Sequence, residues 1–222
     1  AEPVERGEDH VVRGRGHGIP VRVYVPETSG PLPVFVWAHG GGFVLGDIDT
    51  EDPTCRVLAN ATDCAVVSVD YRLAPEHPFP APVHDVYDVT EWAADNADAF
   101  GGDPDRLVVG GASAGGALAA AACLLARDQG GPDIDYQVLA YPVTSRSEEF
   151  DSMEAYSGYF LTEDALAWFD EQYLADPLHG NNPYAYPLEA SDLSDLPPAT
   201  VITAGFDPLQ DQGAAYADAL AD

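Results

Sequence analysis

A serine flanked by glycines is the first feature of this sequence that could do chemistry. Residues 111–115 read Gly-Ala-Ser-Ala-Gly, between an expected strand at 106–110 and an alanine-rich stretch typical of a helix. A strand that turns sharply into a helix projects the serine hydroxyl above the sheet, and glycines two residues away on each side avoid a steric collision. The N-terminus of the following helix favours negative charge beside the hydroxyl oxygen. The pattern predicts that Ser113 is a nucleophile; the alternative is an incidental serine in a turn of small residues.

A run of glycines after another apolar segment is the second chemical feature. Residues 39–43 read His-Gly-Gly-Gly-Phe. Successive glycines let backbone N–H groups approach a ligand without side-chain obstruction, which the stabilisation of a tetrahedral oxyanion requires. The expected donors are the backbone amides of Gly41, Gly42 and Ala114. We interpret His39 as a structural residue that hydrogen-bonds beneath this loop and not as a general base.

An aspartate late in the chain stands where an acid could orient a catalytic base. Asp207 follows the apolar run 199–203 through a short Ala-Gly-Phe link, which places its carboxylate on a loop at the carboxyl end of a strand. A serine followed along the chain by an acid matches the order Ser, acid, His found in one group of catalytic triads. The sequence contains 25 aspartates, so the alternative is a helix N-cap or a turn aspartate.

Alternating strands and helices are expected to position these residues. Apolar runs rich in β-branched residues predict strands that are mostly buried on both faces, and the segments between them have helical periodicity. We therefore expect an α/β fold with a mostly parallel central sheet flanked by helices. The expected strands are 21–25, 34–38, 65–69, 107–109, 138–141 and 199–203, and the expected helices are 53–60, 83–96, 115–128, 162–174 and 212–221.

One long segment interrupts this alternation. Residues 143–196 are rich in aromatic and acidic side chains before the next buried strand. An insertion of this size after the carboxyl end of a strand is where a doubly wound fold keeps a lid. We expect a single domain over residues 1–222 with a cap-like insertion at about 143–196. The aromatic candidates for lining a pocket are Phe43, Tyr159, Phe160, Trp168 and Phe169.

The charge of the chain limits its partners. Thirty-eight acidic residues face nine arginines and no lysine, which gives a formal net charge of −29. A surface this negative repels nucleic-acid phosphates and disfavours binding to an anionic membrane. Aspartate outnumbers glutamate by 25 to 13, and molar salt shortens the Debye length to about 3 Å and screens such repulsion. We therefore predict a halophilic protein whose stability rises with KCl; the alternative is an ordinary acidic protein.

Cysteine usage and hydropathy add further expectations. Cys55, Cys64 and Cys123 are too few and too scattered for a disulfide framework or a zinc site, so we expect buried thiols. No metal or organic cofactor is implied. The sequence has no basic, apolar leader and no run of about 18 uncharged apolar residues. The resulting expectation is a cytoplasmic protein, and the oligomeric state, including a homo-oligomer, is left open.

Four segments together carry a recognisable series of motifs. They read His-Gly-Gly-Gly-Phe at 39–43, Asp-Tyr-Arg-Leu-Ala-Pro-Glu at 70–76, Gly-Ala-Ser-Ala-Gly-Gly at 111–116 and Ala-Gly-Phe-Asp-Pro-Leu at 204–209. This series resembles the signatures of the hormone-sensitive-lipase family of α/β-hydrolases, family IV of the bacterial and archaeal carboxylesterases. The resemblance implies an α/β-hydrolase that cleaves small-molecule esters with short- to medium-chain acyl groups and uses no cofactor. It implies that Ser113 is the nucleophile, that Asp207 orients the base, and that 71–76 shapes the glycine loop without reacting.

The sequence departs from this family in two places. Ala112, before the serine, stands where the family usually has an acidic residue. The family's histidine lies beyond the acid, after one more helix and strand, whereas no histidine follows His179 in this sequence. Only 38 residues precede the His-Gly-Gly-Gly-Phe motif, so the N-terminal helices of the family's cap are expected to be short or absent. We therefore expect a truncated chain that lacks a C-terminal strand and helix, with the base in the missing segment.

Other interpretations stay open beside truncation. A non-catalytic relative could bind a small ligand in the same pocket, which resembles the plant hormone receptor of this family that keeps the serine turn and has lost the histidine. A histidine elsewhere could act as the base, with His179 first because the insertion can fold over the sheet. Among enzymes, a peptidase is the alternative to an esterase. Without an imidazole the serine hydroxyl is poorly activated, and only the oxyanion and binding contributions to catalysis persist.

Overall fold

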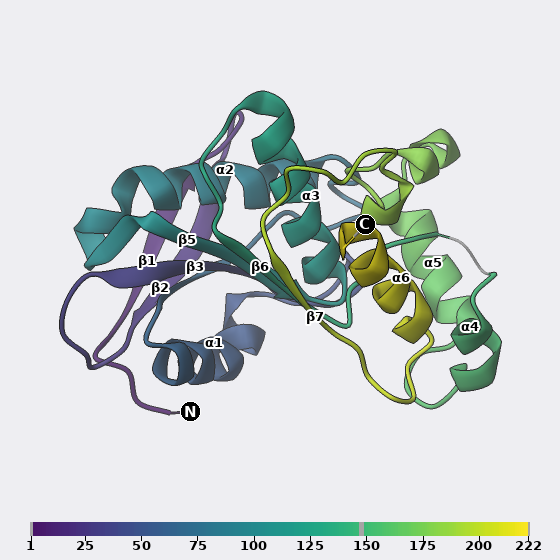
Figure 1. Ribbon diagram of the computed structural model, residues 1–222, viewed down its shortest axis with the longest axis horizontal. Coiled ribbons are helices and arrows are strands. Elements are labelled where there is room, and N and C mark those ends of the chain that lie inside the picture. Colours follow the sequence, from purple (N-terminus) through teal and green to yellow (C-terminus); the bar gives the residue numbers. More distant parts are fainter. Residues whose placement is uncertain (1, 147–148, 222) are drawn as a thin grey trace.

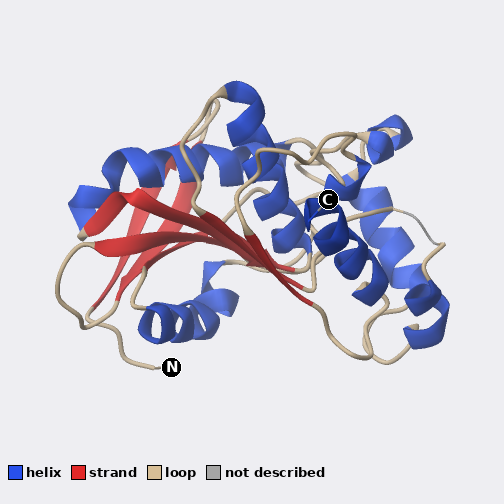
Figure 2. Ribbon diagram, in the orientation of Figure 1, coloured by secondary structure: helices blue, strands red, loops and turns tan. Residues whose placement is uncertain are grey.

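Seven strands form one central sheet in residues 2–146 and 149–221, which the computed structural model describes (Figure 1; Figure 2). The strands are β1 (Arg6–Arg13), β2 (Gly18–Val25), β3 (Leu32–Ala38), β4 (Ala65–Val69), β5 (Gly102–Ala112), β6 (Tyr136–Ala140) and β7 (Ala199–Ile202). Their order in the sheet is β1-β2-β4-β3-β5-β6-β7. β2 pairs antiparallel with β1 and with β4, and all the other neighbours are parallel.

Helices cover both faces of this sheet. They are α1 (Ile48–Thr62), α2 (Ala81–Asn96), α3 (Ala114–Gln129), α4 (Asp151–Tyr156), α5 (Glu163–Tyr173) and α6 (Gln210–Ala221), with the 3₁₀ turns η1 (Ala97–Phe100), η2 (Pro177–Asn181) and η3 (Pro187–Glu189). Figure 1 shows α1 on one face and α2 and α3 on the other. One apolar cluster joins Phe35 and Trp37 of the sheet to Cys55 and Ala59 of α1, and a larger cluster joins the opposite face to α2 and α3. The expected α/β fold with a mostly parallel sheet is confirmed.

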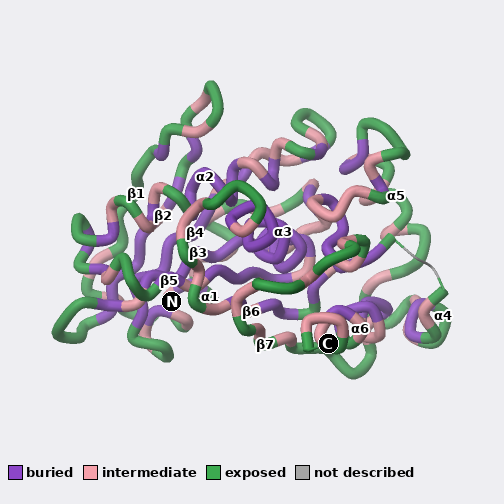
Figure 3. The backbone as a smooth tube through the Cα atoms, turned by 45° about the horizontal axis from the view of Figure 1, so that its top comes forward, coloured by how far each residue is buried: buried purple, intermediate pink, exposed green. Residues whose placement is uncertain are grey.

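The middle strands are the most deeply buried part of the sheet (Figure 3). β4 is buried at every position, and β3 is buried at every position except Pro33. Helices on both faces explain why these two strands are nearly continuous apolar runs in the sequence. β7 differs, because it forms one edge of the sheet and its Ile202 is 50% exposed.

β1 is a strand that the sequence patterns do not predict. Of its eight residues only Val12 is buried, so the strand shows no apolar alternation. It pairs with β2 along its whole length, with Arg6 opposite Val25 and Arg13 opposite Gly18. The N-terminal segment therefore forms the outer edge of the sheet opposite β7.

The chain between β6 and β7 carries α4, α5, η2 and η3. In Figure 1, α4 and α5 lie beyond one end of the sheet, on the side of α6 that faces away from β7. The short helix α4 is not predicted by the sequence, whereas α5 lies within the expected helix 162–174. These helices place residues of the insertion close to the loops that follow the parallel strands.

The three cysteines are free, buried thiols, as predicted. Burial raises the pKa of Cys55 and of Cys123 to about 12, so both stay protonated at neutral pH. Among the described residues, no group of three or more His, Cys, Asp or Glu side chains is placed to hold a metal ion. No helix in that part of the chain is long and apolar enough to cross a bilayer.

Candidate active site

Ser113 lies in the turn that joins β5 to α3. Its backbone has φ 54° and ψ −116°, a conformation that a residue with a side chain rarely adopts. The Ser113 N–H donates to the carbonyl oxygen of Ala140 at 2.8 Å, and the Ser113 carbonyl oxygen accepts from the N–H of Val143 at 3.2 Å. A Cβ on Gly115 would lie 2.1 Å from the carbonyl oxygen of Ala38, so α3 approaches the end of β3 this closely only with glycine. These contacts fix the serine at the carboxyl end of β5.

The glycine loop, residues 40–46, follows β3 and lies beside the serine. A Cβ added to Gly40 would be 3.5 Å from the Cβ of Ser113, which shows how closely the loop backbone passes the side chain. In the described part of the chain, no hydrogen bond uses the backbone N–H of the three predicted donors, Gly41, Gly42 and Ala114. Free N–H groups of this kind can bind an oxygen that becomes negative in a transition state.

His39 is a buried structural residue, as predicted. It is 1% exposed, and its Nδ1 donates to the carbonyl oxygen of Gly40 at 2.7 Å. Its ring stacks on Tyr71 with 4.2 Å between the ring centroids, and the Tyr71 hydroxyl donates to the His39 carbonyl oxygen at 2.8 Å. Burial lowers the pKa of His39. The Ala74 N–H donates to the Phe43 carbonyl oxygen at 2.9 Å, which agrees with the predicted structural role of the segment after β4.

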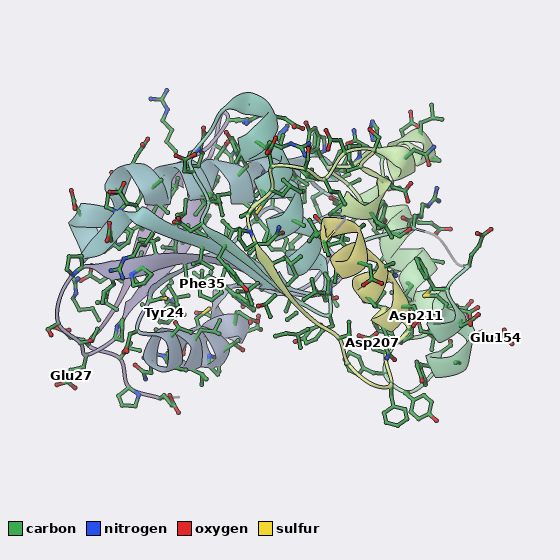
Figure 4. All side chains as sticks on the ribbon, viewed as in Figure 1. Tyr24, Glu27, Phe35, Glu154, Asp207 and Asp211 are labelled. Atoms are coloured by element: carbon green, nitrogen blue, oxygen red, sulfur yellow. The ribbon has the colours of Figure 1, made fainter. Side chains whose placement is uncertain are left out.

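Asp207 lies on the loop between β7 and α6, and Figure 4 shows it near Asp211 at the start of that helix. The Leu209 N–H donates to Oδ1 of Asp207 at 3.0 Å. Burial raises the pKa of the Asp207 carboxyl group above its ordinary value, and the Leu209 N–H acts in the opposite direction. Ser152 of α4 holds the loop: its hydroxyl donates to the Pro208 carbonyl oxygen at 2.7 Å, and its N–H donates to the Asp211 carboxylate at 2.8 Å.

The order of the strands brings these segments to one end of the sheet. β3, β5, β6 and β7 are parallel neighbours, so the loops after them leave from the same side. One strand separates β5 from β7, which is a spacing of roughly 10 Å. Ser113 and Asp207 line one cavity of about 480 Å³. The other lining residues are mainly apolar: Tyr141, Phe160, Leu161, Ala204, Gly205, Phe206, Pro208 and Leu209.

The aromatic lining differs in part from the expected one. Phe160 lines the cavity, whereas Phe43 is buried and stacks on Tyr173. Tyr141 and Phe206 line the cavity without having been indicated by the sequence. Each follows a strand, β6 or β7, and only the pairing of these strands beside β5 brings it to the cavity, so no local sequence pattern indicates it.

Comparisons with known proteins identify the family of the chain. A family model described as alpha/beta hydrolase fold matches residues 35–222. The chain belongs to the α/β-hydrolase fold family. This α/β hydrolase is 46% identical over 219 residues to the carboxylic ester hydrolase LipN of Mycobacterium tuberculosis, a match that covers 96% of the chain and 58% of LipN. It is 41% identical to an arylesterase of Saccharolobus solfataricus, covering 97% of the chain and 71% of the arylesterase.

The fold is also similar to solved structures of esterases. A hyperthermophilic esterase from the archaeon Pyrobaculum calidifontis superposes on this α/β hydrolase with a TM-score of 0.96 and 50% sequence identity, covering 99% of the chain and 73% of the esterase. The thermophilic carboxylesterase EstE1, from a metagenomic library, gives a TM-score of 0.96 at 43% identity, covering 100% of the chain and 76% of EstE1. The chain thus spans between about three fifths and three quarters of the length of these relatives.

The histidines of the described residues lie away from the candidate site. Among the described residues, none of the six histidines lines the cavity or hydrogen-bonds to Ser113 or Asp207. His179 lies in η2 and packs against Phe79, with 5.2 Å between the ring centroids. Ala112, where the resemblance leads one to expect an acid, is a buried residue at the end of β5.

Proposed function

We propose that this α/β hydrolase is a serine carboxylesterase that cleaves short- to medium-chain acyl esters through an acyl-enzyme. The observation that carries the proposal is the juxtaposition of Ser113, on its strained turn, with three free N–H donors and an aspartate that lines the same cavity. The names of the relatives support it, since LipN is a carboxylic ester hydrolase and the Pyrobaculum calidifontis protein is an esterase.

Ser113 is the nucleophile of the proposed reaction. Its Oγ attacks the ester carbonyl carbon, and the N–H groups of Gly41, Gly42 and Ala114 bind the negative oxygen of the tetrahedral intermediate. The bond to the alcohol oxygen then breaks, the alcohol leaves with a proton, and the acyl group stays on Ser113 as an ester. Attack by water releases the carboxylic acid and restores the serine.

Asp207 is proposed to orient the base that takes the Ser113 proton. In the order Ser, acid, His that the resemblance implies, the histidine comes after Asp207, and no histidine follows Asp207 in these 222 residues. We therefore expect slow acylation of this chain, supported by the oxyanion donors and substrate binding. In a serine hydrolase, these contributions alone leave about 10³–10⁴-fold catalysis over water.

The insertion at 143–196 is proposed to act as a cap over the cavity. Phe160 and Leu161 come from this segment and line the cavity together with Phe206 and Pro208 of the β7–α6 loop. An apolar cavity in a strongly negative protein favours neutral, apolar esters over anionic ones.

Salt adaptation is the second part of the proposal. The formal net charge of −29 is carried by 38 acidic residues, and their mutual repulsion opposes folding unless salt screens it. We propose that the protein works at high ionic strength.

One observation favours a second function, a small-ligand-binding protein without catalysis. No histidine among the described residues lines the cavity that contains Ser113 and Asp207. A binding protein of this kind would hold a neutral ester or acid reversibly and form no covalent adduct with the serine.

Chemical rescue distinguishes the two functions. Release of p-nitrophenol from p-nitrophenyl butyrate is measured with and without added imidazole, for the wild type and for Ser113→Ala, so that catalysis by free imidazole is subtracted. An esterase gives a saturable, Ser113-dependent rate that imidazole increases. Equal rates for the two proteins, together with saturable binding of the ester, would establish the binding protein and reject the esterase.

A further inference from the structure

Helix α5 rests directly on the glycine loop, next to the proposed oxyanion donors. An added Cβ on Gly42 would lie 2.4 Å from two ring carbons of Phe169. The Phe169 ring therefore occupies the space that any side chain at position 42 would need. Because Gly42 is one of the proposed oxyanion donors, the aromatic ring of the helix contacts the backbone whose N–H is to bind substrate.

One turn further along α5, Tyr173 holds the next residue of the loop. Its ring stacks on Phe43 with 3.7 Å between centroids and 8° between planes. Phe43 has φ 65°, a left-handed backbone that phenylalanine rarely adopts, so a close packing partner is needed to keep it there. Tyr173 is fully buried and meets Phe79 and Tyr186 edge-on at 5.9 and 6.3 Å.

The backbone of the loop and of the helix is fixed by the same set of contacts. The Tyr173 carbonyl oxygen accepts from the Phe79 N–H at 2.8 Å, and the Phe43 carbonyl oxygen accepts from the Ala74 N–H at 2.9 Å. Within the loop, the N–H groups of Val44 and Leu45 both donate to the Gly41 carbonyl oxygen, at 3.1 and 2.9 Å. A displacement of the Tyr173 ring would therefore be transmitted to the peptide groups of residues 41–45.

The rest of α5 is held less firmly. Its first turn contains Glu163 and Asp164, both exposed, and Trp168 is 47% exposed. Apart from the two aromatic contacts, Asp170 anchors the helix through an ion pair with Arg146 at 2.8 Å and a short hydrogen bond from the Tyr186 hydroxyl. The side of α5 that carries Phe169 and Tyr173 is thus the side through which the helix meets the glycine loop.

We propose that Phe169 and Tyr173 are positioning residues, which hold the N–H groups of Gly41 and Gly42 in the geometry that binds the oxyanion. This inference rests on the proposed esterase function and extends it, because it makes the position of α5 a determinant of how well the oxyanion is bound. Neither side chain lines the cavity that contains Ser113, so each acts through the loop backbone and not on the substrate.

Two measurements on the same variants test this proposal. Hydrogen exchange of the Val44 and Leu45 amides reports loop order without any need for catalysis. The maximal Ser113-dependent acylation rate by p-nitrophenyl butyrate, with imidazole present, is compared with the ester concentration at half-maximal rate. The variants are Phe169→Ala and Tyr173→Leu, with Tyr173→Phe as the conservative replacement and Gln172→Ala as a control on the same helix.

We expect Phe169→Ala and Tyr173→Leu to speed exchange of the two amides and to lower the maximal acylation rate about tenfold or more. The ester concentration at half-maximal rate should change less than twofold, because the cavity lining is intact. Tyr173→Phe keeps the stacked ring and loses a hydroxyl that has no hydrogen-bond partner among the described residues. This variant should therefore retain the wild-type amide exchange and the wild-type maximal acylation rate.

Unchanged exchange at Val44 and Leu45 would overturn the proposal, as would a loss confined to the half-saturation concentration. If Tyr173→Leu does not fold, Phe169→Ala at the half-buried position supplies the same comparison. A wild type that shows no Ser113-dependent acylation would refute the esterase function, and the exchange measurement would still decide whether α5 orders the loop.

Discussion

Gly115→Ala places one methyl group at the contact between α3 and β3. The new Cβ would lie 2.1 Å from the Ala38 carbonyl oxygen and 2.4 Å from that of His39, and real Cβ atoms essentially never come within 3.0 Å of such atoms. Both neighbours are backbone, so the start of α3 must move away by about 1 Å, by comparison with ordinary packing distances. Ser113 precedes this helix and moves with it.

The stability and the activity should change by different amounts. Overpacking costs about 1–3 kcal/mol, and alanine recovers about 1 kcal/mol through its better helix propensity, so the free energy of unfolding should fall by about 1 kcal/mol. A displacement of about 1 Å at a reacting group can cost about 100-fold in rate. We therefore expect Ser113 acylation to fall about 100-fold while the protein stays folded.

The assay pairs urea unfolding with the acylation rate from p-nitrophenyl butyrate, and Gly7→Ala is the matched control. A Cβ on Gly7 would meet only the end of the Arg56 side chain, at 3.8 Å, so this variant should stay within about 0.5 kcal/mol of the wild type and acylate at the same rate. A Gly115→Ala protein as reactive as Gly7→Ala would refute the argument that this glycine sets the position of the serine.

Three other variants or conditions test separate parts of the account. Asp85→Asn should lower the free energy of unfolding by about 3 kcal/mol, because the buried carboxylate accepts two hydrogen bonds from the Arg72 guanidinium at 2.7 and 2.9 Å. A loss below about 1 kcal/mol in urea unfolding would contradict this prediction. The melting temperature should rise steeply from low to molar KCl, since screening reduces repulsion among 38 acidic residues, and an unchanged melting temperature would reject salt adaptation. Burial raises the pKa of Asp207, so this carboxyl group keeps its proton to a higher pH in the folded state than in the unfolded state. Its contribution to the free energy of unfolding therefore falls as the pH rises from the ordinary pKa through the raised pKa. Asp207→Asn should therefore be more stable than the wild type at pH 7 in urea unfolding and lose that advantage at acid pH. An equal or lower stability of the variant at pH 7 would contradict a net cost of burying the charged carboxylate.

The buried strands could be predicted closely, because each one is a run of consecutive apolar residues in the sequence. The run 65–69 is β4 to the residue, and 34–38 is the core of β3, since both lie between helices and need apolar side chains on both faces. β1 could not be found in this way. It lies at the edge of the sheet and buries one side chain, so backbone pairing with β2 determines it and not an apolar pattern.

Helix α1 begins earlier than the expected helix 53–60. Pro53 indicates a first helical turn, but the helix begins at Ile48, after the N-cap Asp47. The Asp47 side chain accepts a hydrogen bond from the Thr50 N–H, and the Thr50 hydroxyl oxygen accepts one from the Asp47 N–H. Asp47 and Thr50 at this spacing were a readable capping signal.

The serine turn, the glycine loop and the aspartate each stand out in the sequence because each motif consists of residues close together in the chain. The structure places Ser113 and Asp207 in one cavity, and their catalytic roles stay predictions. Tyr141 and Phe206 could not be predicted in this way, because each lines the cavity only through the pairing of β5, β6 and β7. The contact of Phe169 with Gly42 joins residues from two distant segments, and no local pattern in either segment indicates it.

The most direct test of the central claim is to locate the acyl group by mass spectrometry after incubation with p-nitrophenyl butyrate. We expect one butyryl group on the peptide that contains Ser113, present in the wild type and in Gly7→Ala and absent from Ser113→Ala. A protein that forms no adduct at Ser113, or that forms the same adducts when Ser113 is alanine, would contradict the assignment of Ser113 as the nucleophile of an esterase.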